Sequence, residues 1–176
     1  MQQLKFRLKG LSPLLLNRFT GEELTNKNST RMEQAEEHAY RSESLDNNLC
    51  IPATNLLRAL ISGAAGTLVG GKGKKTYAKV LAAGLFIEQP ELDLGVKNFI
   101  LFSTPVVIKA TGGRVLRHRA RLNEWAAEGT LNYDEKAIPI EALKKIFLDT
   151  GAMIGLMDFR PEKKGPFGRF TVEFLG

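Results

Sequence analysis

Alternating apolar and polar residues predict a β-strand near each end of the chain. In residues 2–9 (QQLKFRLK), leucine and phenylalanine side chains share one face, while lysine and arginine side chains share the other. Residues 167–175 (FGRFTVEFL) alternate in the same way, with Phe170, Val172 and Phe174 on one side. A period of two is typical of strands that bury one face only. We therefore expect both segments to be half-buried strands.

Two segments have apolar residues at helical spacing. The first, NLLRALISGAAGTL, follows Pro52, and Thr54 or Asn55 is its expected N-cap. The second, IEALKKIFLDTGAMIG, has an apolar stripe of Leu143, Ile146 and Phe147, and its late glycines Gly151 and Gly155 are expected either to allow close packing or to end the helix. Each stripe predicts a helix that packs on a core.

The intervening segments favour strands. We expect a short helical stretch and then a strand near 85–88, followed by strand segments at 99–102 and 105–109. A turn is expected at Gly112–Gly113 and a strand over 114–122. Residues 124–133 are expected to form a hairpin with that strand. The resulting order of strand, helix, strands, helix and strand predicts an α+β fold. Specifically, it indicates one ferredoxin-like or RRM-like domain over 1–176, with two helices packed on an antiparallel sheet.

Residues 19–48 interrupt this order. They are rich in threonine, asparagine, serine and glutamate, and RMEQAEEHAYRSE is their only candidate helix. Residues 22–46 contain seven acidic and three basic residues, a net charge of −4. We interpret 19–48 as an exposed acidic insertion, ordered in contact with a partner.

Composition excludes several classes of protein. The chain has 176 residues, 43% of them hydrophobic, and a single cysteine, Cys50, so it has no internal disulfide framework. With two histidines and scattered aspartates we expect no metal site and no cofactor. No apolar run approaches the length of a membrane span, and the first residues lack a signal-peptide core. These observations predict a cytoplasmic protein that does not enter a membrane.

The charge distribution indicates a polyanionic partner. The net charge is +6, so the chain outside 22–46 carries +10. Two stretches are basic and contain no acid: 72–79 (KGKKTYAK) and 109–121 (KATGGRVLRHRAR). In the second, Arg117, Arg119 and Arg121 share one face of a strand. Such clusters suit a phosphate backbone, whose counterions are released on binding. The alternative is a solvated loop and strand edge.

Two glycine-rich segments bear on phosphate binding. GTLVGGKG (66–73) resembles a phosphate loop, but Gly73 replaces the required hydroxyl residue and the segment follows a helix, so we expect a loop whose lysines reach phosphates instead. The segment 155–170 (GLMDFRPEKKGPFGRF) combines glycines with Arg160 and Arg169. It is either a tight turn before the last strand or a loop that follows a sugar–phosphate chain.

Candidate chemistry is sparse. His118 lies in the arginine cluster and is either an acid–base group for RNA cleavage or one more polar residue of a binding face. We expect His38 to be solvated, and Phe19 and Trp125 are candidates for stacking on bases, although aromatic residues also fill cores. No serine–histidine–aspartate set is recognisable. The sequence thus leaves enzymatic activity undecided and favours a non-enzyme.

Three segments together resemble a known superfamily: FRLKGLSPLLLNRF, CIPATNLLRALISGAAG and GAMIGLMDFRPEKKGPFGRFTVEF. Their pattern is similar to the RAMP superfamily of CRISPR-associated proteins, particularly the backbone subunits that polymerise along guide RNA. It is also similar to small phage and prophage proteins. The resemblance implies an RRM-like core, an inserted finger, and head-to-tail assembly on single-stranded nucleic acid. The resemblance also places residues 52–58 and the C-terminal glycine-rich loop near the backbone of the bound RNA. The chain is short for such a subunit, and GLMDF replaces the usual Gly-x-Gly, which leaves a phage role in DNA metabolism open.

Some relatives of that kind cleave RNA with an aspartate of the first insertion. Asp46 is the only aspartate there, and nothing around it indicates catalysis. We therefore expect a non-catalytic binder of single-stranded nucleic acid, RNA in preference to DNA, with copies of itself or other ribonucleoprotein subunits as partners. The expected contact residues are Arg18, Arg58, Lys72, Lys74, Lys75, Arg114, Arg117, His118, Arg119, Arg121, Arg160, Lys163, Lys164 and Arg169.

Two other functions remain open from the sequence. One is a metal-independent ribonuclease that uses His118. The other is a protein-interaction module whose acidic insertion captures a nucleic-acid-binding complex. Deleting residues 22–46 tests the interaction module, because the deletion is expected to abolish capture of the partner and to leave any RNA binding intact.

Overall fold

The computed structural model describes residues 1–21 and 29–175. Its largest sheet has four strands, each antiparallel to its neighbours. In spatial order they are β10 (Phe170–Leu175), β1 (Gln2–Gly10), β9 (Ala126–Tyr133) and β5 (Leu85–Ile87). The two strands predicted at the ends of the chain therefore lie side by side.

The alternation predicted for β1 is confirmed. Phe6 and Leu8 are fully buried, while Lys5, Arg7 and Lys9 are exposed on the opposite face. That open face carries charges of both signs, since Arg7 lies 3.6 Å from the carboxylate of Glu128 on β9. It is therefore not a uniformly basic surface.

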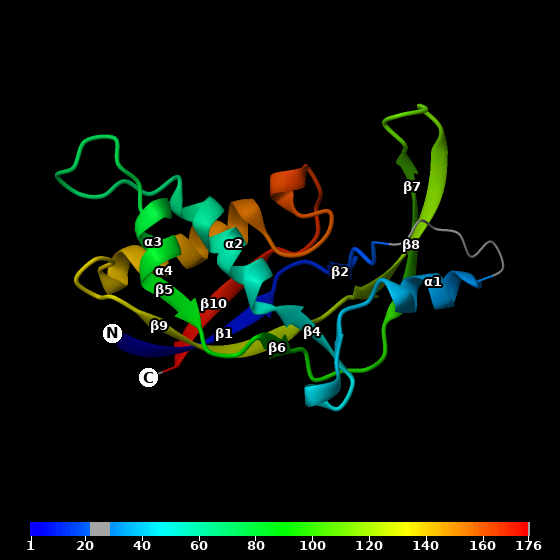
Figure 1. Cartoon of the computed structure of the whole chain (residues 1–176), viewed down its shortest axis with the longest axis horizontal. Coiled ribbons are helices and arrows are strands. Elements are labelled where there is room, and N and C mark those ends of the chain that lie inside the picture. Colours follow the sequence, from blue (N-terminus) through cyan, green and yellow to red (C-terminus); the bar gives the residue numbers. More distant parts are fainter. Residues whose placement is uncertain (22–28, 176) are drawn as a thin grey trace.

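Helices cover the other face of the sheet (Figure 1). They are α2 (Ala53–Ala64), α3 (Ala78–Gly84) and α4 (Ile140–Asp149), which runs into a π-helical turn (Thr150–Ile154). Leu143, Ile146 and Phe147 are buried as their spacing predicts, and the Phe147 ring lies 5.6 Å from that of Phe6. Burying this apolar stripe is the main force that holds α4 on the sheet.

The expected N-cap of α2 is wrong. The helix begins at Ala53, so Thr54 and Asn55 lie inside its first turn, and Pro52 is the N-cap residue without a side-chain hydrogen bond. The free Ala53 N–H donates instead to the carbonyl oxygen of Pro90, 2.9 Å away. A distant backbone group thus satisfies one of the N–H groups that the first turn of a helix leaves without an intrahelical partner.

The α+β architecture is as predicted. The chain runs through β1, α2, β5, β9, α4 and β10 in that order, with additional elements inserted between them. Those insertions build two small sheets. One contains β2 (Leu14–Leu16), β8 (Arg114–Leu122) and β7 (Ile100–Val107); the other contains β3 (Arg41–Ser42), β4 (Asn48–Pro52) and β6 (Glu91–Asp93).

The strands β7 and β8 form a long hairpin at one end of the molecule (Figure 1). The predicted turn at Gly112–Gly113 lies at its tip, and Gly112 adopts a φ of 68°, a conformation that glycine tolerates best. The expected hairpin between 114–122 and 124–133 is wrong, because β9 pairs with β1 and β5 rather than with β8. The chain instead leaves one sheet and enters the next.

The helix expected within the acidic insertion is confirmed as α1 (Arg31–Glu37). Thr30 and Glu33 form a capping box: Glu33 N–H donates to Thr30 Oγ1 at 3.2 Å, and Thr30 N–H donates to the Glu33 carboxylate at 2.7 Å. Ala35 of this helix is fully buried, and the helix packs on β8. The described part of 19–48 is thus folded within this chain; residues 22–28 lie outside the described residues.

Candidate nucleic-acid interface

A groove lies between the hairpin, α1 and the segment that follows β2. We call it the arginine groove; it encloses about 730 Å³. Its polar and aromatic lining includes Arg18, Phe19, Gln34, His38, Arg117, His118 and Arg119. Of the described residues that line it, none is acidic. Three segments far apart in sequence therefore form one positively charged surface.

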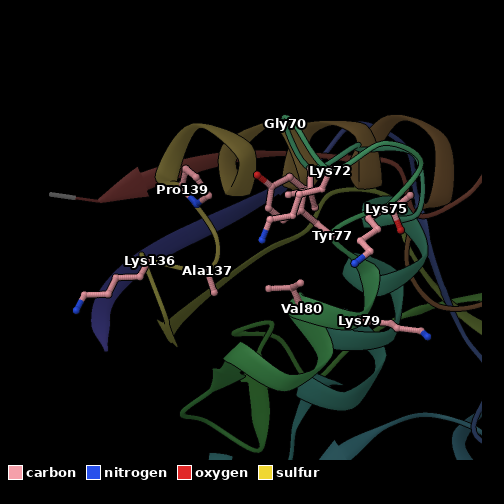
Figure 2. Close-up of a pocket in the computed structure, with 11 residues that line it drawn as sticks. Gly70, Lys72, Lys75, Tyr77, Lys79, Val80, Lys136, Ala137 and Pro139 are labelled. Atoms are coloured by element: carbon pink, nitrogen blue, oxygen red, sulfur yellow. The ribbon is translucent and has the colours of Figure 1, made fainter.

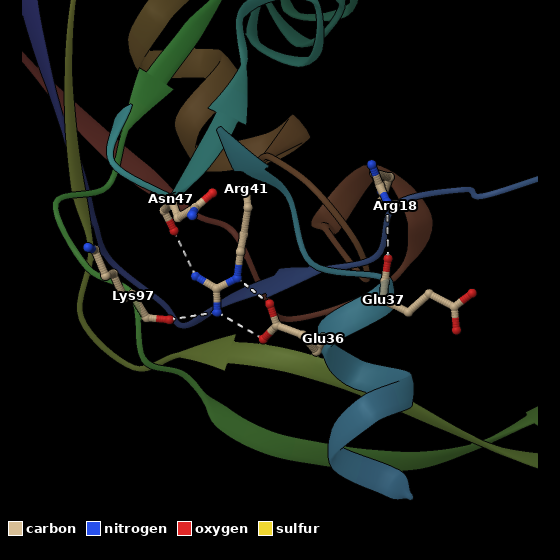
Figure 3. A network of polar contacts seen from close by, with 6 residues as sticks. All are labelled: Arg18, Glu36, Glu37, Arg41, Asn47 and Lys97. Atoms are coloured by element: carbon tan, nitrogen blue, oxygen red, sulfur yellow. Dashed lines mark hydrogen bonds and ion pairs between the residues drawn. The ribbon is translucent and has the colours of Figure 1, made fainter. Parts of the chain in front are cut away.

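Hydrogen bonds hold the segment after β2, which carries Arg18, against the end of α1. Arg18 N–H donates to the His38 carbonyl oxygen at 2.7 Å, and His38 Nδ1 lies 2.7 Å from the Arg18 carbonyl oxygen. Because a carbonyl only accepts, Nδ1 carries the proton in that bond. The Arg18 guanidinium also donates to the Glu37 carbonyl oxygen at 3.4 Å (Figure 3).

Arg41 anchors the other side of α1 (Figure 3). Its guanidinium forms a two-bond ion pair with Glu36 and donates to the carbonyl oxygens of Asn47 and Lys97, at 2.9 and 2.8 Å. The hydrogen bond from Arg41 lowers the pKa of the Glu36 carboxyl, so this carboxylate is committed inside the fold. Similarly, Lys97 binds Asp46 at 2.7 Å and lowers its pKa. Part of the negative charge of the insertion is therefore neutralised by its own contacts.

The two aromatic candidates have opposite environments. Phe19 lines the arginine groove and is 90% exposed, so its ring is open for stacking on a base. Trp125 is 6% exposed; its ring packs on Gly10, lies 6.4 Å from that of Phe170, and donates through Nε1 to the Ser12 carbonyl at 2.9 Å. The prediction of Trp125 as a stacking residue is wrong, because the tryptophan fills the core.

The arginines of β8 are less exposed than the sequence indicates. Arg117 is half-buried and lines the groove. Arg119 is 6% exposed, forms an ion pair with Asp158, and stacks on the Phe159 ring at 5.1 Å. The Arg119 charge is thus committed to an internal partner.

Arg119 nevertheless has a free donor. Its Nη1 is buried and has no hydrogen-bond acceptor within residues 1–21 and 29–175. Buried polar groups of native proteins nearly always have a partner, so this unmet guanidinium donor is an exception among the described residues.

Arg121 lies on the same face of β8, two residues after Arg119. Its guanidinium stacks between the Phe102 and Phe167 rings, 5.8 and 6.0 Å from their centroids, and its Nε has no acceptor within the described residues. Arg121 therefore links β8 to the C-terminal loop and does not line the groove. The cation–π contacts make it a structural residue here.

The C-terminal glycine-rich loop, 155–168, is compact and covers these arginines. Its ends meet where Leu156 N–H donates to the Gly168 carbonyl oxygen at 2.9 Å, and Gly168 N–H donates to that of Pro13 at 2.8 Å. A Cβ at Gly165 would lie 1.8 Å from the Phe159 carbonyl oxygen. Glycine is therefore required for tight packing of this loop, which supports its interpretation as a tight turn.

The basic residues near that loop form a second, weaker cluster. Arg58, Arg160 and Lys163 line one shallow pocket of about 520 Å³, together with Glu162. Glu162 binds the Arg160 guanidinium at 2.7 Å, which cancels its charge locally. Arg169 donates to the Ala152 carbonyl oxygen, whereas Lys164 is exposed.

The structure separates the two basic stretches of the sequence. The loop with Lys72, Lys74 and Lys75 lies beyond α3, at the end of the long axis opposite the hairpin (Figure 1). Arg114 is exposed on the hairpin but does not line the arginine groove. A single site built from all the expected residues therefore does not exist in this fold.

His118 and His38 line the same groove, which the sequence did not indicate. His118 is 9% exposed, and its Nδ1 lies 2.7 Å from Ser103 Oγ. Burial, and then the charge of Arg31, lower the pKa of His118, which favours the neutral form of its imidazole. The residues are 80 positions apart, and only the packing of α1 on β8 brings them together.

No protein-family model matches this chain, and no curated protein matches it either. Over residues 1–21 and 29–175, no group of three or more histidine, cysteine or acidic side chains is arranged to hold a metal ion. Within the same residues, no helix has the length and apolar character needed to cross a membrane.

Proposed function

We propose that this protein binds single-stranded nucleic acid, RNA in preference to DNA, through the arginine groove, in the cytoplasm. The observation that carries the proposal is the composition of this groove: an exposed Phe19 ring together with the charged side chains of Arg18 and Arg117. Single-strand binders combine a stacking platform with positive charge along the backbone. Both components are present here on one surface.

The resemblance to the RAMP superfamily supports the same function. On the basis of this resemblance, the proposal also includes head-to-tail assembly of several copies along one strand. The stoichiometry of protein on strands of increasing length measures this part of the proposal, because assembly requires more bound copies on longer strands.

Reversing the groove charge tests the proposal. We expect the double variant Arg18→Glu, Arg117→Glu to bind a fluorescein-labelled single-stranded RNA at least roughly tenfold more weakly in fluorescence anisotropy, since two phosphate contacts become repulsive. For the unmodified protein, two arginine contacts to a single strand predict a loss of affinity of roughly sevenfold between about 50 and 200 mM salt.

The matched control is Lys72→Glu, Lys75→Glu, which changes the net charge equally at the opposite end of the molecule. At physiological salt its charges are screened from the groove, so the affinity for an RNA with a 5′-hydroxyl end remains within about twofold. Equal losses in both variants, or affinity that is independent of salt, would contradict a local site. Tighter binding of single-stranded DNA than of RNA would transfer the proposal to phage-type DNA metabolism.

A second candidate function is metal-independent RNA cleavage, which the presence of both histidines in one groove favours. His118 is the base that removes the proton of a ribose 2′-hydroxyl. The 2′-oxygen then attacks phosphorus, the P–O5′ bond breaks, and His38 is the acid that gives a proton to the leaving oxygen. The products are a 2′,3′-cyclic phosphate and a 5′-hydroxyl.

Incubating labelled RNA with the pure protein in EDTA tests this candidate. We expect cleavage in EDTA that His38→Ala and His118→Ala each reduce by about 100-fold or more, the size of a general acid–base contribution. Intact RNA after incubation, or cleavage that persists in both alanine variants, removes the candidate and leaves the binding function unaffected.

A further inference from the structure

A second cavity lies at the end of the molecule opposite the hairpin. It encloses about 960 Å³ between α3, the start of α4 and the loop 66–76 (Figure 2). Its apolar part is formed by Val69, Val80 and Pro139, next to the buried side chain of Tyr77. We call it the lysine pocket, because Lys72, Lys75, Lys79 and Lys136 complete its lining.

The lysines of this pocket are unpaired. None of the four forms an ion pair with an acidic side chain in the part of the chain that the structure describes, and none of the described lining residues is acidic. Four lysines around one cavity with no acidic residue among its described lining create a positive potential, which attracts an anion. The charge complementarity therefore favours an anionic occupant.

The backbone holds the lysine loop over the cavity. Val69 N–H donates to the Lys75 carbonyl oxygen at 2.8 Å, and Tyr77 N–H donates to that of Thr67 at 3.1 Å. Gly71 and Gly73, with φ of 71° and 64°, form the bend between them. Figure 2 shows Gly70, Lys72 and Lys75 on the loop above Val80, while the amino groups of Lys136 and Lys79 point outward in opposite directions. Lys72 and Lys75 are thus the lysines that the loop holds beside the apolar surface.

We propose that the lysine pocket binds a nucleoside phosphate. Ammonium groups bind phosphates as point charges, and the apolar surface of Val69, Val80 and Pro139 suits a flat base. The volume lies in the usual range for small-molecule sites. Because Gly73 replaces the hydroxyl residue of a phosphate loop, the site binds the ligand without the magnesium contact of that motif.

Two kinds of ligand contain a nucleoside phosphate: a free nucleotide such as ATP, and the 5′-phosphorylated terminal nucleotide of a strand. The pocket and the arginine groove lie at opposite ends of the molecule, so this site does not depend on the proposed function. Variants of the two sites can accordingly be tested independently.

Fluorescence anisotropy with methylanthraniloyl-ATP, and with a 3′-labelled RNA carrying a 5′-triphosphate, tests the proposal. The RNA is measured on the Arg18→Glu, Arg117→Glu background, which removes binding by the groove. We expect saturable binding of at least one probe, and a dissociation constant that rises at least roughly tenfold when Lys72→Glu, Lys75→Glu is introduced. The lysines are exposed, so these changes preserve the fold, which a thermal melt verifies.

The control is Lys5→Glu, Lys9→Glu, which makes the same change in charge on the open face of the main sheet and is expected to leave the binding of both probes within about twofold. Binding of the ATP probe identifies the free nucleotide as the source; binding of only the triphosphorylated RNA, but not of the same RNA with a 5′-hydroxyl, identifies the strand end. If neither probe binds saturably, or if the Lys72→Glu, Lys75→Glu variant binds like its parent, the proposal is overturned.

Discussion

Asp158→Ala is expected to lower the free energy of unfolding by about 3 kcal/mol, the usual cost of removing one partner of a buried ion pair. Asp158 binds the Arg119 guanidinium, whose side chain is only 7% exposed. Without the carboxylate, Arg119 retains a buried charge whose Nη1 already has no acceptor within the described residues. Urea denaturation followed by circular dichroism measures the loss.

Asp149→Ala is the matched control, because its carboxylate binds Lys145 at the surface of α4. An exposed ion pair contributes less than about 1 kcal/mol, so the free energy of unfolding of the control is expected to remain close to that of the unmodified protein. A loss for Asp158→Ala no larger than that of the control would show that water or another group compensates Arg119. In that case the arginine would not depend on the C-terminal loop.

Gly151→Ala is expected to cost about 2–3 kcal/mol, the upper range for overpacking a core. An added Cβ would lie 2.0 Å from the Phe170 carbonyl oxygen, which belongs to the backbone of β10. A backbone atom at that distance must move, and β10 pairs with β1, so the shift propagates into the main sheet. The predicted close packing at Gly151 is thereby confirmed, while Gly155, with a φ of 71°, ends the π-helical turn.

Gly66→Ala is the control for Gly151→Ala. Its added Cβ would lie 3.6 Å from the nearest atom, the Gly63 carbonyl oxygen, which is an ordinary contact. Thermal melts should therefore show a lower melting temperature for Gly151→Ala only. Equal melting temperatures for the two variants would mean that β10 and the end of α4 separate without cost.

Much of the scaffold follows from local patterns. The alternation in β1, the stripe of Leu143, Ile146 and Phe147, and the helix in 31–37 are properties of neighbouring residues, so periodicity and capping predict them. The α+β class follows from the order of these elements. The hairpin expected between β8 and β9 failed because strand pairing depends on distant residues, here those of β1 and β5.

The site was predicted only in part. Sequence indicated Phe19, Arg18 and the arginines of β8, but it could not show that 72–79 lies at the other end of the fold. Trp125 was misjudged because its environment is made by Gly10 and Phe170, which are remote in sequence. His38 was missed as a groove residue for the same reason, since its neighbour across the groove is on β8.

The sequence alone determined the strands β1 and β10, the helices α2 and α4, the charge of each segment and the residue types available for chemistry, because these depend on residues a few positions apart. Tertiary structure decided which charges are paired. It buried Arg119 against Asp158, stacked Arg121 between two phenylalanines, and left Arg18, Arg117 and the pocket lysines without acidic partners in the described chain. Electrostatic interactions and burial act between groups that are close in space, and only the folded chain brings those groups together.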